Sequence, residues 1–288
     1  MRDTLRPRRM KVRIDYQTQY AYAEPVSFSL HLFRLFPKTG RHLAVQRLAF
    51  QTNAGADVHY RHDLFDNEIA SVFYPGKSAL LAVNLQIDLD VQERNPFGFI
   101  LAKHALDFPF AYAPREAEVL APYLRSSGPL VLPFWSAPEA PRDTVETLVS
   151  LNEALHQNIA YERREEGAAH AAAETLRLGG GSCRDYAVLL ADVARGLGVA
   201  ARLASGYLCE FEGGKKVAAG ALHAWTELYL PGAGWIGFDP TNGYLCNHYH
   251  LTAAVGLTPD DISPIAGTFA PPLPAPPMMS ASLQINPA

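Results

Sequence analysis

The glycine run Gly179-Gly180-Gly181 and the cysteine that follows it constrain the fold more than any other part of this sequence. Successive glycines permit backbone conformations closed to other residues and let a second chain segment approach closely. Ser182 is a favourable N-cap residue, and the apolar run over 187–197 predicts a buried helix with Gly198 as its left-handed C-terminal cap. Cys183 is therefore predicted in the first turn of a helix.

This position of Cys183 has two interpretations. The unpaired amides and the dipole at a helix N-terminus favour a thiolate over a thiol. The same amides can donate hydrogen bonds to an oxyanion that forms on an acyl substrate. The alternative is a buried, inert cysteine, which is common for this residue type. The segment favours a reactive cysteine and leaves the inert one open.

The composition excludes several classes of protein. A length of 288 residues, 48% hydrophobic and 19% charged content and a net charge of −4 describe a soluble globular chain with room for two domains. They imply no bulk attraction to nucleic acid or to an anionic membrane. Three widely spaced cysteines argue against a disulfide framework and fit a reducing compartment. With no signal-peptide core and no apolar run of about 18 residues, we expect a cytoplasmic protein without membrane or nucleic-acid partners.

Strand signals dominate the first part of the chain. Val12, Ile14 and Tyr16 alternate with polar residues, and the segment 82–91 places five apolar residues on one face. We therefore predict a frayed or disordered leader over 1–10 and a small all-β sandwich over 11–110. Prolines forbid long elements over 111–142, which we interpret as a packed connector because it is rich in aromatic residues.

The second domain is predicted over 143–270, followed by a Pro-rich C-terminal tail over 271–288 that runs extended along the surface. A helix-start signal at Asp143-Thr144 precedes an apolar stripe from Leu148 to Ile159, which should pack on the helix that carries Cys183. Strands are predicted over 200–208, 223–230 and 235–239. Helices followed by antiparallel strands make the predicted fold class α+β.

A reactive thiol needs a base, and a histidine in that role needs an acceptor that holds its tautomer. His223 opens one predicted strand and Asp239 ends the next. Taken singly, a histidine at a strand edge such as His223 usually has no catalytic role, and an Asp-Pro pair such as Asp239-Pro240 usually marks a turn. Together with Cys183, in the order Cys, His, Asp, they indicate a catalytic triad.

The hairpin between these strands supplies a geometric condition. Side chains on paired antiparallel strands share a face only where their positions are opposite or offset by two. Because 223 and 239 sum to an even number, His223 and Asp239 share a face only if the loop has an odd number of residues or a bulge intervenes. A regular four-residue loop over Pro231 to Gly234 would separate them. We predict a three- or five-residue loop, or a bulge.

The motifs of the second domain resemble the bacterial transglutaminase-like family within the papain-like cysteine enzyme superfamily. The matching runs are Gly181-Ser182-Cys183-Arg184-Asp185-Tyr186-Ala187, Arg202-Leu203-Ala204-Ser205-Gly206-Tyr207-Leu208, His223-Ala224-Trp225-Thr226-Glu227-Leu228-Tyr229 and Gly234-Trp235-Ile236-Gly237-Phe238-Asp239-Pro240-Thr241-Asn242. The first domain is similar to the β-rich N-terminal domain of this family through Tyr20-Ala21-Tyr22 and His59-Tyr60-Arg61. The resemblance implies a Cys-bearing helix packed on an antiparallel sheet, and it implies that Cys183, His223 and Asp239 are catalytic.

Further candidates for oxyanion or substrate contacts are Ser182, Tyr161, Trp225, Trp235, Asn242 and His250. The two tryptophans either wall an acyl groove or belong to the core. The run Cys246-Asn247-His248-Tyr249-His250 invites a metal interpretation, but a closed zinc site needs four ligands. We expect no metal or other cofactor and prefer solvent-facing histidines, with His250 near the mouth of the site.

These observations predict thiol-dependent acyl chemistry on peptide or isopeptide amides of a peptide or protein substrate, by way of an acyl-enzyme. Hydrolysis, as in a cysteine peptidase or amidase, is slightly favoured over amine transfer because nothing marks an amine site. Two alternatives stay open. One is a transglutaminase that cross-links proteins, and the other is a non-catalytic binding or scaffold protein with the same fold.

Overall fold

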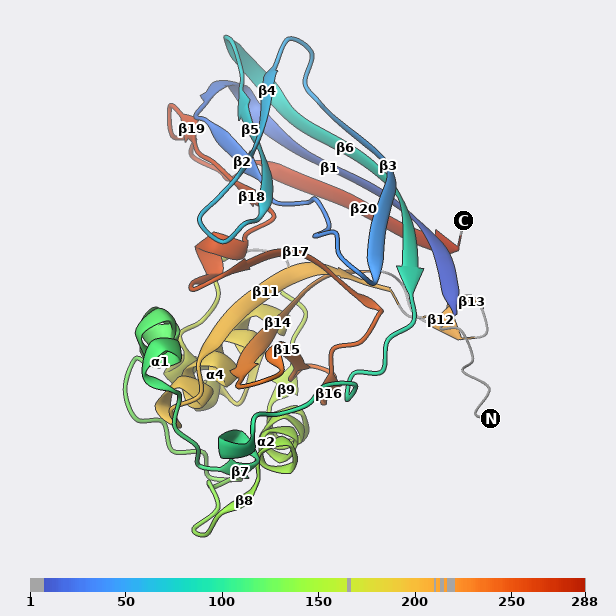
Figure 1. Cartoon of the computed structure of the whole chain (residues 1–288). Helices are drawn as coiled ribbons and strands as arrows, with labels where there is room; N and C mark the ends of the chain where they lie inside the picture. Colours follow the sequence, from blue (N-terminus) through green and yellow to red (C-terminus); the bar gives the residue numbers. More distant parts are fainter. Residues whose placement is uncertain (1–7, 165–166, 210, 213–214, 217–220, 288) are drawn as a thin grey trace.

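The computed structural model describes residues 8–164, 167–209, 211–212, 215–216 and 221–287. Two packed antiparallel sheets form an N-terminal β-sandwich, and a third sheet with helices against it forms the second domain (Figure 1). The predicted α+β class, a transglutaminase-like fold with a β-rich N-terminal domain, is confirmed.

The sandwich contains one sheet of order β19-β1-β6-β3, in which β20 also pairs with β1, and a second sheet of order β18-β2-β5-β4. The strands are β1 (Arg9–Phe28), β2 (His31–Phe33), β3 (Leu43–Thr52), β4 (Asp57–His62), β5 (Glu68–Phe73), β6 (Lys77–Gln92), β18 (Ile265–Ala266), β19 (Phe269–Ala270) and β20 (Met278–Pro287).

The predicted alternation is confirmed along both long strands. Val12, Ile14 and Tyr16 on β1 are buried between more exposed neighbours, and the odd-numbered residues from Leu81 to Val91 on β6 are buried in the same way. Alternation places each set on one face of the sheet. These faces form the core of the sandwich.

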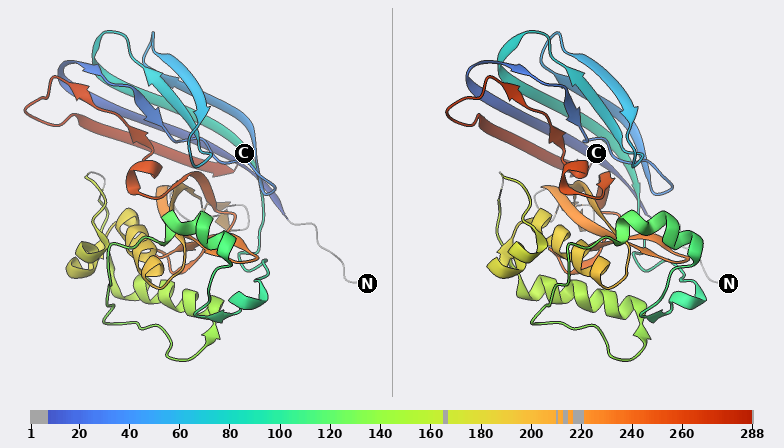
Figure 2. Two further views of the ribbon diagram at one scale, coloured as in Figure 1. Left: turned by 60° about the vertical axis from the view of Figure 1, so that its left-hand side comes forward. Right: turned by 90° about the vertical axis from the view of Figure 1, so that its left-hand side faces the viewer.

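The last residues of the predicted C-terminal tail run extended, as expected, but they form a strand of the sandwich and not a separate tail. β20 pairs with β1 in register from Ala21↔Met278 to Val12↔Pro287, and Ile285 is fully buried in the sandwich. The dense run of prolines ends at Pro277, and from Met278 to Asn286 every residue has a backbone N–H that can donate to the ladder. Figure 2 shows this strand beside β1 in both views. Because β18 and β19 also belong to the sandwich, the second domain ends near Ile262 and not at 270.

The predicted N-terminal boundaries also shift. β1 already begins at Arg9, within the predicted leader, while residues 1–7 lie outside the described residues. The N-terminal part of the sandwich ends with β6 at Gln92, and the following segment belongs to the second domain. The Ala102 amide donates to the Pro231 carbonyl at 2.7 Å, and Phe108 is buried in the second core. The sequence pattern did not reveal this boundary, because the segment after Gln92 is joined to the second domain only by contacts with residues far away in the chain.

The second domain has a sheet of order β16-β15-β14-β11-β17. Its elements are η1 (Lys103–Ala105), β7 (Asp107–Phe108), α1 (Pro114–Leu120), η2 (Ala121–Leu124), β8 (Arg142–Asp143), α2 (Thr144–Asn158), β9 (Ala160–Tyr161), α3 (Ala172–Leu178), β10 (Gly180–Gly181), α4 (Cys183–Gly196), β11 (Ala201–Leu208), β12 (Phe211–Glu212), β13 (Lys215–Lys216), β14 (Ala221–Leu230), β15 (Gly234–Asp239), β16 (Tyr244–Leu245), β17 (His250–Gly256) and η3 (Pro259–Ile262).

Helices α2 and α4 cover the side of this sheet that faces away from the sandwich (Figure 2). The predicted stripe Leu148, Leu151, Leu155 and Ile159 is buried in one core with α4, as expected. The Asp143 side chain caps α2 by accepting from the Glu146 amide at 2.9 Å. Within the described residues, no helix combines the length and the apolar character needed to cross a bilayer.

The two domains share buried contacts. Tyr207 on β11 lies in the sandwich core and donates its hydroxyl to the Leu35 carbonyl at 2.8 Å. The buried Asn67 side chain both donates to the Val255 carbonyl at 2.8 Å and accepts from the Val255 amide at 2.9 Å. Each of these buried polar groups has its hydrogen-bond partner in the other domain, so the two domains pack as one unit.

Candidate active site

The start of α4 is built by the glycine run. Gly179 ends α3 with φ +66°, and Gly180 and Gly181 form the short strand β10 parallel to β9. A Cβ on Gly181 would lie 2.7 Å from the Asp185 Cβ, so only glycine permits this approach. The chain then enters α4 with Cys183 as its first residue, as predicted, and the side chain is half-buried.

Asp185 holds this helix start together. Its fully buried carboxylate accepts from the Ser182 amide at 2.7 Å, the Ser182 hydroxyl at 2.8 Å and the His170 amide at 2.7 Å, and Arg164 bonds both oxygens. Burial alone would raise the pKa of Asp185, but these donors lower it. Sequence reasoning missed this role, although Ser followed three residues later by an acid is a capping-box signal.

The Cys183 sulfur meets the N-terminal half of β14. It faces the His223 imidazole and the backbone amide of Ala224, and both interactions favour a negative charge on the sulfur. β14 pairs with β15 only from Thr226 to Leu230. His223 and Ala224 therefore pair with β11 on one side but have no strand partner on the β15 side. Burial alone would raise the pKa of Cys183. The contacts with His223 and Ala224 outweigh it and lower the pKa, which favours the thiolate.

The hairpin satisfies the predicted parity condition. Leu230 pairs with Gly234, which leaves the three-residue loop Pro231-Gly232-Ala233. Continued along the strands, this register places Asp239 opposite Trp225 and offset by two from His223, on the same face. The His223 Nε2 atom lies 2.8 Å from Asp239 Oδ2. The three predicted residues are therefore linked, from sulfur to imidazole to carboxylate.

The Asp239 carboxylate is fully buried and accepts several hydrogen bonds. Oδ1 accepts from the amides of Thr241 at 3.0 Å and Asn242 at 3.2 Å, and Oδ2 accepts from Asn242 Nδ2 at 2.8 Å and from His223. Burial would raise the pKa of Asp239, but the charge of His223 and the hydrogen bonds from His223 and His250 lower it far below its usual range. Burial would likewise lower the pKa of His223, but Asp239 and Cys183 raise it.

His250 is buried beside Asp239, which corrects the expectation of a solvent-facing residue at the mouth of the site. Its Nε2 atom lies 3.0 Å from Asp239 Oδ2, and its Nδ1 atom accepts from the Asn247 amide at 3.3 Å. These partners define a neutral ring with the proton on Nε2. Burial lowers the pKa of His250, which agrees with a neutral imidazole.

The other candidates fall into different places. Ser182 is buried and its hydroxyl is occupied by Asp185, so it is not an oxyanion donor. Asn242 supports Asp239 and does not face a substrate. Tyr161 is 56% exposed; desolvation raises the pKa of its hydroxyl, and the charge of Cys183 raises it further.

The two tryptophans lie on the His223 side of the sheet. Trp225 is buried, stacks on His223 with ring centroids 6.3 Å apart, and presents an edge to His250 at 5.3 Å. It therefore backs the histidines and does not wall a groove at the sulfur. Trp235 is half-buried and lies under the Arg202 guanidinium, 4.4 Å from its ring centroid.

A metal site at Cys246, His248 and His250 is not formed. Burial raises the pKa of Cys246 well above its usual value, and its sulfur packs on Gly237. Potential ligand atoms of His223, Asp239 and His250 lie within 4.8 Å of one another. At Asp239 Oδ2, however, both histidines are at hydrogen-bond distance, so a proton lies along each contact.

Comparison with known proteins gives the family. Residues 136–240 match the sequence model of the Transglutaminase-like superfamily, and residues 12–90 match that of the Bacterial transglutaminase-like N-terminal region. The chain carries a transglutaminase-like core behind a bacterial transglutaminase-like N-terminal region. This confirms the predicted resemblance over both domains.

Relatives of this transglutaminase-like chain add the fold. An uncharacterized protein of Mycobacterium leprae is 32% identical over 92 residues, which is 31% of this chain and 32% of that protein. One of Mycobacterium tuberculosis is 30% identical over 133 residues, which is 44% of this chain and 42% of that protein. The alignments thus span less than half of either relative. The crystal structure of "a Putative Cysteine Protease from Cytophaga hutchinsonii" superposes with a TM-score of 0.71 at 15% identity, over 99% of this chain and 92% of that one, which shows a shared fold.

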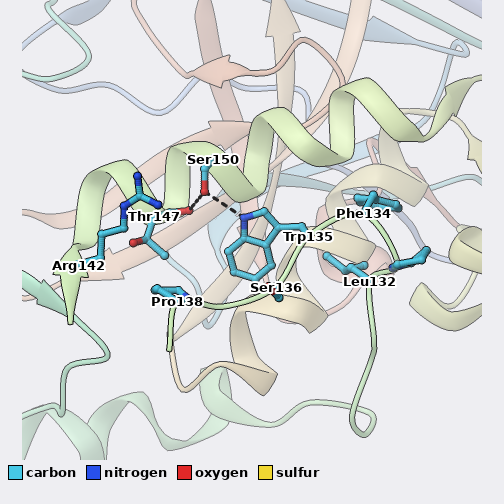
Figure 3. A pocket seen from close by; sticks show the side chains of 9 residues that line it. Leu132, Phe134, Trp135, Ser136, Pro138, Arg142, Thr147 and Ser150 are labelled. Atoms are coloured by element: carbon cyan, nitrogen blue, oxygen red, sulfur yellow. Dashed lines mark hydrogen bonds between the residues drawn. The ribbon is translucent and has the colours of Figure 1, made fainter. Parts of the chain in front are cut away.

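Two cavities flank the transglutaminase-like core. One of about 510 Å³ lies between the connector segment 132–138 and α2, where Trp135 Nε1 donates to the Ser150 hydroxyl at 3.0 Å (Figure 3). Its lining includes none of the predicted site residues. The other, of about 290 Å³, lies between the two domains and is lined in part by Trp225 and His250.

Proposed function

We propose that the chain is a thiol-dependent amidase or peptidase that acts through an acyl-enzyme. The observation that carries the proposal is the placement of His223 between the Cys183 sulfur and the Asp239 carboxylate, to which His223 Nε2 is hydrogen-bonded at 2.8 Å. The pKa of Cys183 is lowered and that of His223 is raised, which favours a thiolate–imidazolium pair. Cysteine nucleophiles are activated in this way.

In the acylation step, the Cys183 sulfur attacks the carbonyl carbon of an amide, and a C–S bond forms. Amides in the first turn of α4 and the positive end of its dipole stabilise the negative oxygen of the tetrahedral intermediate. His223 transfers its proton to the departing nitrogen as the C–N bond breaks, which leaves neutral imidazole and an amine product.

In the deacylation step, neutral His223 takes a proton from water while the water oxygen attacks the thioester carbon. The C–S bond breaks, the acid product leaves, and the thiolate–imidazolium pair is restored. Asp239 accepts a hydrogen bond from Nε2 of His223, so that the other ring nitrogen, Nδ1, faces Cys183 in both steps.

A direct test combines labelling and product analysis. Cys209 and Cys246 are buried, so a thiol-directed reagent should label the folded protein at Cys183 and label the Cys183→Ala variant hardly at all. A matched Cys209→Ser variant should retain labelling. Labelling well below the free thiol pKa of about 8.5 would support activation, whereas a normal titration would favour a non-catalytic scaffold.

The reaction itself is tested on a panel of peptide amides with and without a primary amine. Mass spectrometry of products separates hydrolysis, which yields a free acid, from amine transfer, which yields a new amide. Turnover retained by Cys183→Ala would remove Cys183 as the nucleophile.

A further inference from the structure

The interdomain cavity of about 290 Å³ is lined from both domains. The N-terminal domain and the segment after it contribute Lys38, Arg41 and Arg94, and the transglutaminase-like sheet contributes Trp225 and Arg202. Its volume is at the lower end of the range of roughly 300–1,000 Å³ that is usual for ligand sites. Neither Cys183 nor His223 is in its lining, so this cavity is distinct from the proposed site of acyl transfer.

The charge of this lining is positive. Four cationic side chains face it against one carboxylate, that of Glu227, which is paired with Arg202 at 2.6 Å. Among the described residues, no carboxylate lies within ion-pair distance of Lys38, Arg41 or Arg94.

Of the three cations without a carboxylate partner, Lys38 and Arg94 donate to main-chain carbonyls of the described residues. Lys38 Nζ donates to the carbonyls of Phe65 at 3.4 Å and of Asp66, and Arg94 donates to the Cys246 carbonyl at 3.2 Å. Carbonyl oxygens hold these side chains in place without neutralising them. Burial lowers the pKa of Lys38, while the more distant Asp66, Asp63 and Glu227 raise it.

A buried donor belongs to the same lining. The Trp225 side chain is 1% exposed, and its indole nitrogen is not among the fully buried unpaired polar atoms of the described residues, although the residue lines the cavity. Gly237 lies in front of it: a Cβ there would be 3.4 Å from Trp225 Nε1 and 2.7 Å from the Cys246 Cβ. Buried N–H groups normally have a partner. Glycine at this position leaves the indole N–H open to the cavity.

We propose that this cavity binds a small organic oxyanion, either a carboxylate or a phosphate ester. Its oxygens accept from the Trp225 indole and pair with Arg94, Arg41 and Lys38, and its short apolar part lies on Leu43 and Val91. Charge-assisted hydrogen bonds to an oxyanion are the strong class of such contacts. The N-terminal domain thereby completes a ligand site that the transglutaminase-like core lacks alone.

The test uses the full chain with Cys183→Ala, so that binding is measured independently of the proposed catalysis. Titration calorimetry at pH 7 and constant ionic strength compares inorganic phosphate, citrate and chloride. We expect saturable binding of phosphate or of citrate beyond the chloride baseline, and the stronger of the two identifies the class of ligand. Heat no greater than that of chloride for both probes would overturn the proposal.

Variants locate the site. Arg94→Gln and Trp225→Phe should each weaken binding by about tenfold or more, because the first removes the positive charge of the guanidinium and the second removes the indole N–H donor. Arg115→Gln, an exposed arginine on α1, is the matched control and should bind as the parent does. Equal affinity in all three variants would place any bound anion elsewhere and contradict the proposal. Thermal unfolding of each variant verifies that it is folded.

Discussion

His250 Nε2 lies 3.0 Å from Asp239 Oδ2, the same oxygen to which His223 donates at 2.8 Å. One carboxylate oxygen thus serves two buried imidazoles. Asn247 donates to the other nitrogen of His250, so this ring stays neutral, while His223 is the histidine that carries charge. We infer that His250 is a positioning residue that holds Asp239 in the orientation that His223 requires.

Replacing His250 separates positioning from packing. In His250→Ala, Asp239 loses one donor, and we expect acyl transfer or Cys183 alkylation at neutral pH to slow by about tenfold, with unfolding easier by about 1–3 kcal/mol. In His250→Gln, the side-chain amide can donate from a similar place and should restore most of the rate. The readout is the pH profile of alkylation, which a purely structural role would leave unmoved.

Asp239→Asn should remove the charge that favours imidazolium. The pKa of His223 then falls, so less thiolate forms at neutral pH, and the alkylation midpoint of Cys183 moves up toward about 8.5. Turnover should fall by about 100-fold or more, since the histidine tautomer is no longer held. Asp260→Asn, on the exposed η3 turn, is the control and should change neither quantity.

The thiolate–imidazolium pair has a defined effect on stability. The raised pKa of His223 stabilises the fold below its unfolded value of about 6.5, and this contribution is lost as pH rises through the folded value of about 10. The lowered pKa of Cys183 acts in the opposite sense: its contribution is present above the unfolded value of about 8.5 and is lost as pH falls through the folded one. Where both groups are charged in the folded protein and both are neutral in the unfolded chain, the two slopes cancel, because forming the pair releases no net proton.

Cys183→Ala removes this cancellation. We expect its free energy of unfolding to fall with pH above about 6.5 relative to that of the unchanged protein, by up to about 1.4 kcal/mol per pH unit. Urea unfolding at several pH values between 6 and 9 measures this difference. A difference that stays constant across that range would contradict this expectation.

Asp185→Ala should destabilise the start of α4. The variant leaves the Ser182 and His170 amides without their acceptor and Arg164 without its ion pair, and we expect a loss of about 3–5 kcal/mol. Urea unfolding provides the measurement. Asp260→Ala is the exposed control, and an equally small loss in both variants would contradict the role of Asp185.

Local sequence determined the parts of this protein that depend on neighbours along the chain. The glycines, Ser182 and the apolar run specified a helix that begins at Cys183, and the alternation of β1 specified its buried face. Because the side-chain period of a strand is two, the parity of 223 and 239 restricted the hairpin loop to the odd length that is observed.

Tertiary structure decided what depends on distant partners. Nothing local to Met278–Pro287 specifies pairing with β1, because the register is set by burial of Ile285 across more than 250 positions. His250 is likewise buried against Asp239 only because β17 pairs with β11 and brings the histidine beneath the carboxylate. Local patterns constrain backbone conformation and faces, whereas the choice among possible strand partners is made by the packing of the whole chain.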